Sequence, residues 1–271
     1  IFRKGENEMD LGLQGKSVIV TAASKGLGKA TAKQFAAEGA HVLLSSRNEK
    51  ELEKAKQEIR SETGNNHVDF AVCDITNPQD IKNLVAKAVE MNGTVDVLVN
   101  NAGGPPAGTF DKFDDDVWQN AFELNLLSFV RTIREVLPYM RKHGGGHIIN
   151  FASSSIKQTL DNLILSNTFR AGIVGLAKSL SQELAKDNIL INTLGPGRIA
   201  TDRVAQLDQI RADNLGVTVD EVREQTEKSI PIGRYGEPEE FANVAVYLCS
   251  GANSYVTGQA FVVDGGLVKA L

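Results

Sequence analysis

The segment LSNTFRAG, residues 165–172, places a hydroxyl and a guanidinium four residues apart, on Ser166 and Arg170. The pattern predicts the start of a helix, where side chains at this spacing share one face. A run of hydroxyls, Ser153, Ser154 and Ser155, lies shortly upstream. A fixed positive charge beside hydroxyl donors can polarise a carbonyl group and stabilise negative charge that develops on its oxygen. We therefore take these residues as the candidate catalytic group.

A serine nucleophile would be another use of the same hydroxyls. It requires a histidine base, which is oriented in turn by an acid. The histidines, at positions 41, 67, 143 and 147, fall at the starts of expected strands and in expected surface loops. The sequence therefore disfavours a hydrolase, and we expect His147 to be structural.

A glycine-containing turn, TAASKGLGKA at residues 21–30, is the candidate anion site. It follows an apolar strand pattern and opens a helical one, so backbone N–H groups and the positive end of the helix dipole would face a phosphate. In that position the turn predicts a dinucleotide site, and a turn that only packs helix on strand is the alternative. The residues expected to form the site are Thr21, Ala23, Ser24, Lys25, Gly26, Leu27 and Gly28.

The end of the second expected strand indicates which dinucleotide binds. An acid usually stands there in dinucleotide folds, for the ribose 2′-hydroxyl of NAD. This chain has Arg47 and Asn48 instead, and Lys25 adds a second cation on the same side. Arginine stacks on adenine and binds phosphate in a bidentate manner. The sequence therefore predicts NADP(H) as the cofactor, with solvated surface charges as the alternative interpretation.

The elements that must position these groups alternate between short β-branched strands and longer amphipathic helices. Such alternation predicts a parallel sheet with helices on both faces, and the strands are almost wholly apolar, as expected of strands covered on both sides. We therefore predict an α/β fold, a single Rossmann-type, doubly wound domain with a seven-stranded parallel sheet. The expected strands are 17–21, 41–45, 68–73, 95–99, 147–151, 189–194 and 260–263, and the expected helices are 26–38, 49–62, 78–91, 115–143, 168–186 and 219–227.

The expected domain covers residues 9–271. The segment before it, residues 1–8, is polar and aperiodic, and we interpret it as a disordered arm or a remnant of expression. Inside the domain, the long stretch between Pro196 and Pro231 contains no expected strand. An excursion of this kind, after the carboxyl end of a strand, often covers the ligand. Residues 202–230 are therefore the expected substrate lid.

The composition disfavours several classes of binding partner. The net charge of −5 disfavours nucleic acid or an anionic membrane as the main partner. Apolar runs are much shorter than the ~20 residues that a membrane span needs. The two cysteines, Cys73 and Cys249, each stand alone and fit free thiols better than a disulfide or a metal site. We expect a cytoplasmic protein that binds no nucleic acid, membrane or metal.

Seven motifs follow one another along the chain: TAASKGLG (21–28), CDIT (73–76), VNNAG (99–103), ELNLLS (123–128), IINFASS (148–154), PGRIAT (196–201) and VTGQAFVVDGG (256–266). In this order they resemble the short-chain dehydrogenase/reductase family, in its β-ketoacyl-ACP (3-oxoacyl-ACP) reductase-like branch. The resemblance extends from residue 13 to residue 267 and implies an NADP(H)-dependent oxidoreductase that assembles as a homotetramer, or as a homodimer.

The resemblance also implies a role for each matching position. Adenine would contact Asp74 and Ile75, and the adenine ribose would lie against Asn101, Ala102 and Gly103. The nicotinamide amide and the pyrophosphate would be held by Pro196, Gly197, Ile199 and Thr201. A proton-relay water would be held by Asn125, and the substrate carbonyl by Ser153.

Two positions depart from the family pattern. The family's catalytic tyrosine and lysine are expected at positions 166 and 170, where this chain has Ser166 and Arg170. A serine hydroxyl is shorter and far less acidic than a phenol, so it would need an intervening water to protonate the substrate. Arg170 keeps a positive charge, for the cofactor ribose or a developing alkoxide, but releases a proton only with difficulty. The first glycine of the phosphate motif is also replaced, by Ala22, which a turn tolerates without strain only at negative φ.

Other residues could supply the proton instead. The candidates between the serine run and Ser166 are Ser154, Ser155, Lys157 and Asp161. A buried lysine can titrate near neutral pH, but we expect Lys157 to be a solvated loop residue. Two functions therefore remain open: an oxidoreductase that reduces a small-molecule or acyl-thioester carbonyl with an altered proton donor, or an NADP(H)-binding regulatory or scaffold protein with little or no turnover.

The longer helices carry apolar residues beyond one stripe. A helix that is apolar on more than one face needs a second partner, which favours an oligomer, and burial wholly within one monomer is the alternative. The residues concerned are Leu126, Phe129, Ile133, Leu176, Leu180 and Leu184.

Overall fold

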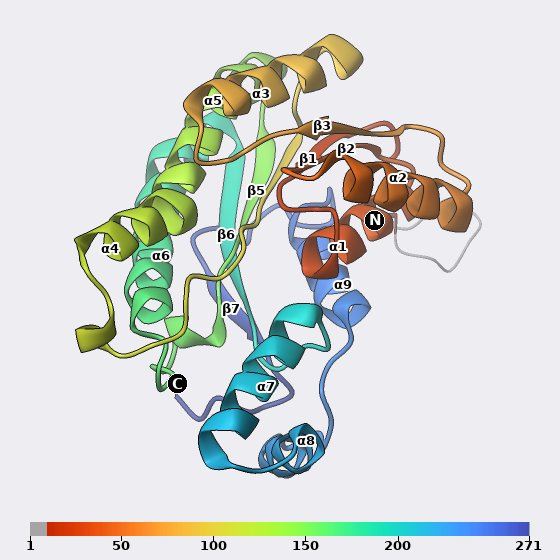
Figure 1. Ribbon diagram of the computed structural model, residues 1–271. Coiled ribbons are helices and arrows are strands. Elements are labelled where there is room, and N and C mark those ends of the chain that lie inside the picture. Colours follow the sequence, from red (N-terminus) through yellow and green to blue (C-terminus); the bar gives the residue numbers. More distant parts are fainter. Residues whose placement is uncertain (1–9, 271) are drawn as a thin grey trace.

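The computed structural model describes residues 10–270, so the arm expected at residues 1–8 lies outside the described residues. Within them one parallel sheet runs in the order β3-β2-β1-β4-β5-β6-β7 (Figure 1). The prediction of a seven-stranded, doubly wound parallel sheet is confirmed. The strands are β1 (Ser17–Val20), β2 (His41–Ser46), β3 (Val68–Val72), β4 (Val97–Asn100), β5 (Gly146–Phe151), β6 (Ile189–Pro196) and β7 (Ala260–Val263).

Helices cover both faces of the sheet (Figure 1). One face carries α1 (Gly26–Ala37), α2 (Glu49–Thr63) and α9 (Pro238–Leu248), and the other carries α3 (Pro78–Asn92), α5 (Ser128–His143) and α6 (Ile164–Leu184). Within β1, Val18 and Val20 enter the first core and Ile19 enters the second. The strands are apolar at successive positions because successive side chains face opposite cores.

The expected helix 115–143 is divided into three parts. It begins as α4 (Asp115–Phe122), widens to a π-helical turn at Glu123–Leu127, and continues as α5. Such turns often occur at functional sites, and this one carries Asn125, whose side chain is fully buried. Short 3₁₀ turns occur at Phe110–Lys112, Ser154–Ile156 and Ala185–Asp187.

The helix expected over residues 168–186 corresponds to α6, which begins earlier than predicted, at Ile164. Asn162, two residues before Ile164, adopts a left-handed φ of 58°. The side chain of Asn167 then folds back, accepting from Leu160 N at 3.2 Å and donating to Leu160 O at 2.9 Å. These contacts fix the first turn of α6, on which Ser166 lies.

Two helices project from the main body at the bottom of Figure 1. The sequence predicts α8 (Val219–Ser229) but not α7 (Asp202–Leu215), which precedes it. The buried carboxylate of Asp208 holds α7, accepting from Arg198 Nη1 at 3.0 Å and from Tyr235 Oη at 2.8 Å. This pair of helices occupies the segment expected to be the lid.

The apolar residues that suggested an oligomer lie in one core. Phe129, Ile133 and Leu184 are buried in it, and Leu126, Leu176 and Leu180 pack against it. The first three are covered by the chain itself, whereas the other three are only partly buried, and the homotetramer stays a prediction. In residues 10–270, no helix combines the length and apolar character needed to cross a bilayer.

Candidate active site

A cleft of about 1730 Å³ opens where the strands end and the lid helices begin. Ligand pockets commonly measure roughly 300–1,000 Å³, so this one has room for a dinucleotide together with a substrate. The predicted site residues that line it are Ser24, Lys25, Gly26, Leu27, Arg47, Asn48, Asp74, Ile75, Asn101, Ala102, Gly103, Ser153, Ser166, Arg170, Pro196, Gly197, Ile199 and Thr201. Four predicted site residues are not among its lining residues: Thr21, Ala23, Gly28 and Asn125.

The turn between β1 and α1 forms a cradle of backbone. Helix α1 begins without a side-chain cap and without an acid in its first turn, so its free N–H groups can receive an anion. Gly26 takes a φ of 56°, and a Cβ on Gly28 would lie 2.4 Å from the carbonyl oxygen of Ala22. The turn is tied to β4 by Thr21, whose Oγ1 donates to Asn101 O and accepts from Asn101 N, both at 2.7 Å. A dinucleotide phosphate fits this arrangement.

Ala22 lies in the same turn with a φ of 47°. The expected tolerance of alanine depended on a negative φ, and the positive φ found here means that Ala22 is strained. The left-handed conformation costs an alanine roughly 1–2 kcal/mol. Asn101 Nδ2 donates to Ala22 O at 3.2 Å, and Ala23 N donates to Ser45 O at 2.9 Å, so neighbouring contacts hold the strained residue in place.

The residues expected at the adenosine end of the cofactor begin after β2. Arg47 and Asn48 are exposed and line it, and Asn48 also caps α2 by accepting from Glu51 N at 3.1 Å. Lys25, expected beside Arg47, instead lies with its Nζ 3.4 Å from Asp202 Oδ2. Both partners are highly exposed, so this ion pair contributes little. Arg47 is therefore the stronger candidate for a 2′-phosphate contact.

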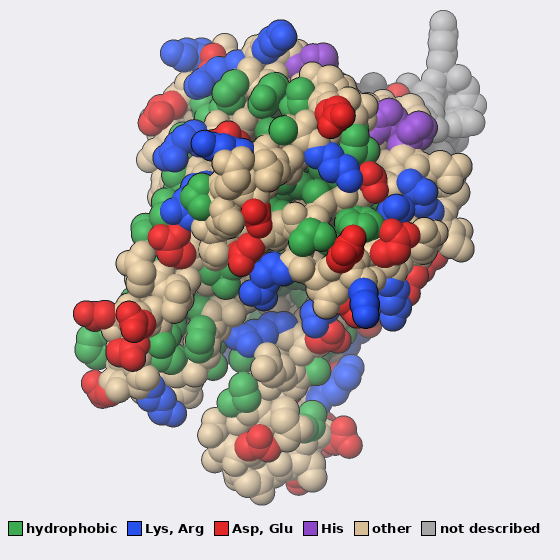
Figure 2. Space-filling view, turned by 45° about the horizontal axis from the view of Figure 1, so that its top comes forward, with side chains coloured by type: hydrophobic (Ala, Val, Ile, Leu, Met, Phe, Trp, Pro, Cys, Tyr) green, Lys and Arg blue, Asp and Glu red, His purple; other side chains and the backbone are tan. Residues whose placement is uncertain are grey.

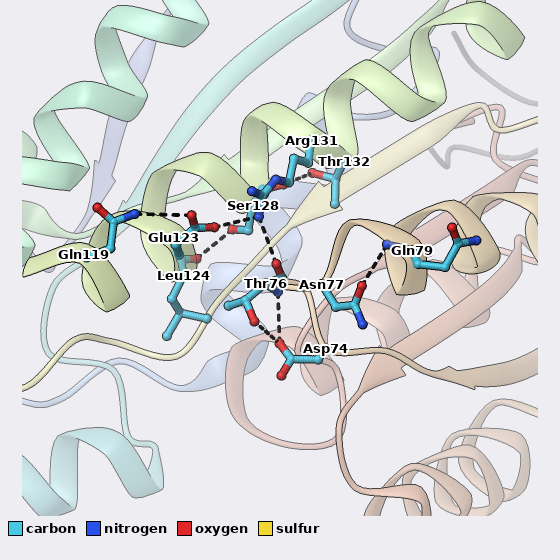
Figure 3. Close-up of polar contacts among 10 residues, drawn as sticks. All are labelled: Asp74, Thr76, Asn77, Gln79, Gln119, Glu123, Leu124, Ser128, Arg131 and Thr132. Atoms are coloured by element: carbon cyan, nitrogen blue, oxygen red, sulfur yellow. Dashed lines mark hydrogen bonds and ion pairs between the residues drawn. The ribbon is translucent and has the colours of Figure 1, made fainter. Parts of the chain in front are cut away.

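The loop after β3 is organised around Asp74 (Figure 3). Asp74 Oδ1 accepts from Thr76 N at 2.9 Å and from Thr76 Oγ1 at 2.8 Å. Arg131 of α5 donates to Thr76 O at 2.9 Å and to Glu123 Oε2 at 2.7 Å (Figure 3). One arginine thus fixes the adenine-side loop relative to the π-helical turn.

That π-helical turn also supports the loop after β4. Asn125 Nδ2 donates to Gly103 O at 2.8 Å, whereas Asn125 Oδ1 is buried and has no hydrogen-bond partner in the described chain. Buried polar atoms are rarely left without a partner. The free oxygen can therefore accept a hydrogen bond from water or from a bound group.

The structure brings three residues of the candidate catalytic group together. Ser153, Ser166 and Arg170 line one cleft, and Ser166 and Arg170 are only 8% and 4% exposed. Arg170 Nη1 donates to Phe151 O at 2.7 Å, and Arg170 Nε is buried without a partner. Burial, and to a lesser extent the charge of Arg203, lowers the pKa of Arg170 to about 10. Arg170 therefore remains positively charged at neutral pH.

The other candidate proton donors differ in whether they line the cleft. Ser154 and Asp161 line the cleft, and Ser155 Oγ is buried without a partner in residues 10–270. Lys157 is exposed and does not line the cleft, so the expectation of a solvated lysine is confirmed. His147 is also remote from the cleft; its Nε2 lies 3.2 Å from Asn253 O, and burial lowers its pKa. These contacts agree with the structural role expected for His147, which stays a prediction.

The sequence did not indicate which lid side chains enter the cleft. Arg203, in the first turn of α7, donates through Nη2 to Pro105 O at 2.8 Å and so spans from the lid to the loop after β4. Further along the same helix, Val204, Leu207 and Arg211 also line the cleft. Figure 2 shows Lys and Arg side chains around the hollow between the main body and the projecting lobe.

Comparison with known proteins gives concordant matches. A family model described as enoyl-(acyl carrier protein) reductase matches residues 21–268. A 3-oxoacyl-(acyl-carrier-protein) reductase of Chlamydia pneumoniae is 38% identical over 261 residues, which cover 96% of this chain and 99% of that protein. Among solved structures, L-sorbose reductase from Gluconobacter frateurii, complexed with NADPH and L-sorbose, has a TM-score of 0.91 at 34% identity and covers 97% of this chain and 100% of its own. A 7α-hydroxysteroid dehydrogenase complexed with NADH has a TM-score of 0.86 at 34% identity and covers 95% and 96%.

Proposed function

The chain belongs to the short-chain dehydrogenase/reductase family and is 3-oxoacyl-ACP reductase-like, and from this premise we propose that it reduces a carbonyl substrate with NADP(H). The observation that carries the proposal is the single cleft that joins a phosphate cradle at Ser24–Leu27 to the group Ser153, Ser166 and Arg170. The substrate would be a small molecule or an acyl thioester. Among the similar structures both NADPH and NADH are bound, so the preference for NADP(H) rests on Arg47.

The proposed reaction assigns a task to each part of the cleft. When bound, the reduced cofactor supplies a hydride. Ser153 Oγ would donate a hydrogen bond to the carbonyl oxygen, and the charge of Arg170 would stabilise the negative charge that develops there. Because Ser166 is a weak acid, a water that hydrogen-bonds to it would deliver the proton from solvent. Asn125 Oδ1, which has no protein partner within the described chain, can hold a further water of that path.

A regulatory or scaffold protein that binds NADP(H) with little turnover is the second candidate. The observation that favours it is the hydrogen bond of Arg170 Nη1 to the Phe151 backbone, which uses one of the donors expected to serve the cofactor. Ser166 stands where the family has its acid and offers no replacement with a suitable pKa. In this alternative the cleft would keep its affinity for the cofactor and lose the proton path.

The two candidates are separated by binding and turnover measured on the same protein. NADPH affinity is determined by titration calorimetry, and NADPH oxidation is followed with β-ketoacyl thioesters, diketones, quinones and aldehydes. Tight binding with no turnover on any class would contradict the reductase. Turnover that is lost in Arg170→Ala, with NADPH still bound, would contradict the regulatory alternative.

We also propose that the chain forms a homotetramer or a homodimer. Large apolar side chains that remain exposed support this assembly: Phe110, Tyr255 and Phe261 are 66%, 95% and 37% exposed. Size-exclusion chromatography with light scattering gives the mass in solution, and a monomer at micromolar concentration would contradict the proposal.

A further inference from the structure

Two arginines face the substrate end of the cleft from different elements. Arg170 comes from α6 and Arg203 from α7, and both line the cleft. Within residues 10–270 neither guanidinium has a carboxylate at ion-pair distance: Arg170 donates to Phe151 O, and Arg203 donates to Pro105 O and Gln206 Oε1. By contrast, Arg198, on the same side of the cleft, is paired with Asp208 at 3.0 Å. Arg47 and Arg211 also line the cleft without a carboxylate of the described chain at ion-pair distance, but both are exposed, whereas Arg170 is buried and Arg203 is half-buried.

Burial makes this pair an anion site. Arg170 is 4% exposed and its Nε has no partner, although it forms part of the cleft wall. Buried charges are normally paired, because an uncompensated charge in a low-dielectric environment is costly. A second guanidinium of the same sign nearby adds repulsion. An anion that enters the cleft would relieve both penalties and could bind both forks in a bidentate manner.

The position of Arg170 indicates what carries the anion. Its hydrogen-bonded partner, Phe151, lies two residues before Ser153, which is the group proposed to hold the reacting carbonyl. The phosphate cradle is a different part of the cleft, at the start of α1. An anion at Arg170 therefore lies beside the carbonyl of the substrate rather than on the phosphate-binding turn.

We propose that Arg170 and Arg203 bind a carboxylate of the substrate, so that the substrate is an α- or β-oxo acid. The apolar residues of α7 that line the cleft, Val204, Leu207 and Ile210, suit an apolar body on the same molecule. The inference rests on the proposed reductase function and narrows its substrate class. The acids Asp161 and Asp202 also line the cleft; both are exposed, and Asp202 lies 3.4 Å from Lys25 Nζ.

The reaction balances without a further reagent. The carbonyl carbon accepts a hydride from NADPH, its C–O π bond breaks, and the oxygen takes one proton from solvent through the site. An oxo acid becomes a hydroxy acid, NADPH becomes NADP⁺, and the carboxylate is unchanged. Arg170 and Arg203 keep their protons throughout.

The test compares acids with their own esters. The probes are benzoylformate with its methyl ester, and acetoacetate with its ethyl ester, each with saturating NADPH. We expect kcat/KM to favour the acids by about 100-fold, the range for a buried charge pair that loses one partner. Binding is measured separately, by titration calorimetry of benzoylformate into the protein loaded with NADP⁺.

Matched variants then test whether Arg203 causes the preference for acids over esters. Arg203→Gln should lower kcat/KM for the acids by about 100-fold and change the esters by less than about threefold, with weaker benzoylformate binding; Arg203→Lys should restore part of the loss. Arg134→Gln is the control, because Arg134 is exposed on α5 and does not line the cleft. Its effect on the acids should be within about threefold, as for a screened surface charge.

Several outcomes would overturn the inference. Esters reduced as well as acids would show that no carboxylate site exists, although the proposed reductase function would stand. Weaker NADPH binding in Arg203→Gln, with the preference for acids unchanged, would assign the pair to the cofactor phosphates. If no carbonyl compound is reduced, the reductase proposal fails; Arg203-dependent binding of benzoylformate to the NADP⁺ complex would still support the carboxylate site, and its absence would overturn that as well.

Discussion

The phosphate-binding turn and the catalytic group lie in one cleft but are built differently. In the turn, backbone atoms do most of the work: Gly26 and Gly28 set its path, and Thr21 ties it to Asn101 through both backbone groups. In the candidate catalytic group, side chains do most of the work, and two buried polar atoms have no protein partner among residues 10–270: Ser155 Oγ and Arg170 Nε.

The difference shows which part is complete without a ligand. A backbone cradle needs only the right conformation, so it exists before the cofactor arrives. Buried side-chain atoms without partners are costly and point to water or a bound molecule as the missing partner. In the proposed function, the cofactor would bind to a preformed surface, whereas the substrate or water would supply the missing hydrogen-bond partners of the candidate catalytic group. The predictions below test this contrast.

The largest effect is expected in the turn, from Gly28→Ala. The added Cβ would lie 2.4 Å from Ala22 O and 2.8 Å from Asn101 Nδ2, so backbone must move. We expect a loss of about 3 kcal/mol in the free energy of unfolding, the upper range for overpacking, together with loss of NADPH binding. Urea unfolding and titration calorimetry measure the two.

The control for this change is Gly175→Ala in α6, where an added Cβ meets nothing within 4 Å. Alanine is the better helix former, so this variant should be neutral or more stable by up to about 1 kcal/mol. Equal losses in the free energy of unfolding in the two variants would mean that the close contacts at Gly28 do not cause the loss.

The catalytic group is tested by the double change Ser166→Tyr with Arg170→Lys. A phenol beside an ammonium restores the family's general acid, and general acid catalysis contributes at least about 100-fold. We expect a gain of that size in kcat for carbonyl reduction with NADPH, while each single variant gains less than about tenfold because the two residues act together. No gain in the double variant would show that the rest of the cleft has also diverged from a reductase site.

Much of the fold could be predicted from the sequence, because strands buried on both faces must be apolar and their order follows from β–α alternation. Helix α7 could not, since it buries Asp208 and Ala212 while its apolar Leu207 faces the cleft. The pattern of apolar residues in α7 therefore does not show which face of the helix packs on the core. Its larger apolar residues line the cleft instead of the core.

The sequence indicated some residues of the cleft and missed others for related reasons. Cofactor residues follow motifs that are local in sequence, and the structure brings most of them to one cleft. Arg203 belongs to no such motif. Its importance comes from a contact with Pro105, 98 residues away, which only the folded lid creates. The strain at Ala22 was likewise invisible, because a residue type does not reveal its φ.

A smaller effect is expected from Arg47→Ala, which tests how the cradle selects its cofactor. Removing the guanidinium should weaken NADPH binding about tenfold, the value of one charge-assisted phosphate contact, and should leave NADH binding nearly unchanged. Lys25→Ala is the matched control, because Lys25 already pairs with Asp202 and is expected to change either affinity by less than about threefold. Equal weakening of NADPH and NADH by Arg47→Ala would falsify the 2′-phosphate assignment.

The smallest effect concerns the strain in the cradle itself, and Ala22→Gly tests it. Glycine adopts a φ of 47° without a Cβ clash, but it also gains freedom in the unfolded chain, which offsets part of the benefit. We expect a net stabilisation of about 0.5 kcal/mol in urea unfolding, with NADPH affinity unchanged because the backbone path is the same. Ala171→Gly, at an exposed position inside α6, should instead lose about 1 kcal/mol. If both glycine variants lose stability equally, Ala22 is not strained, and the cradle is as relaxed as an ordinary helix.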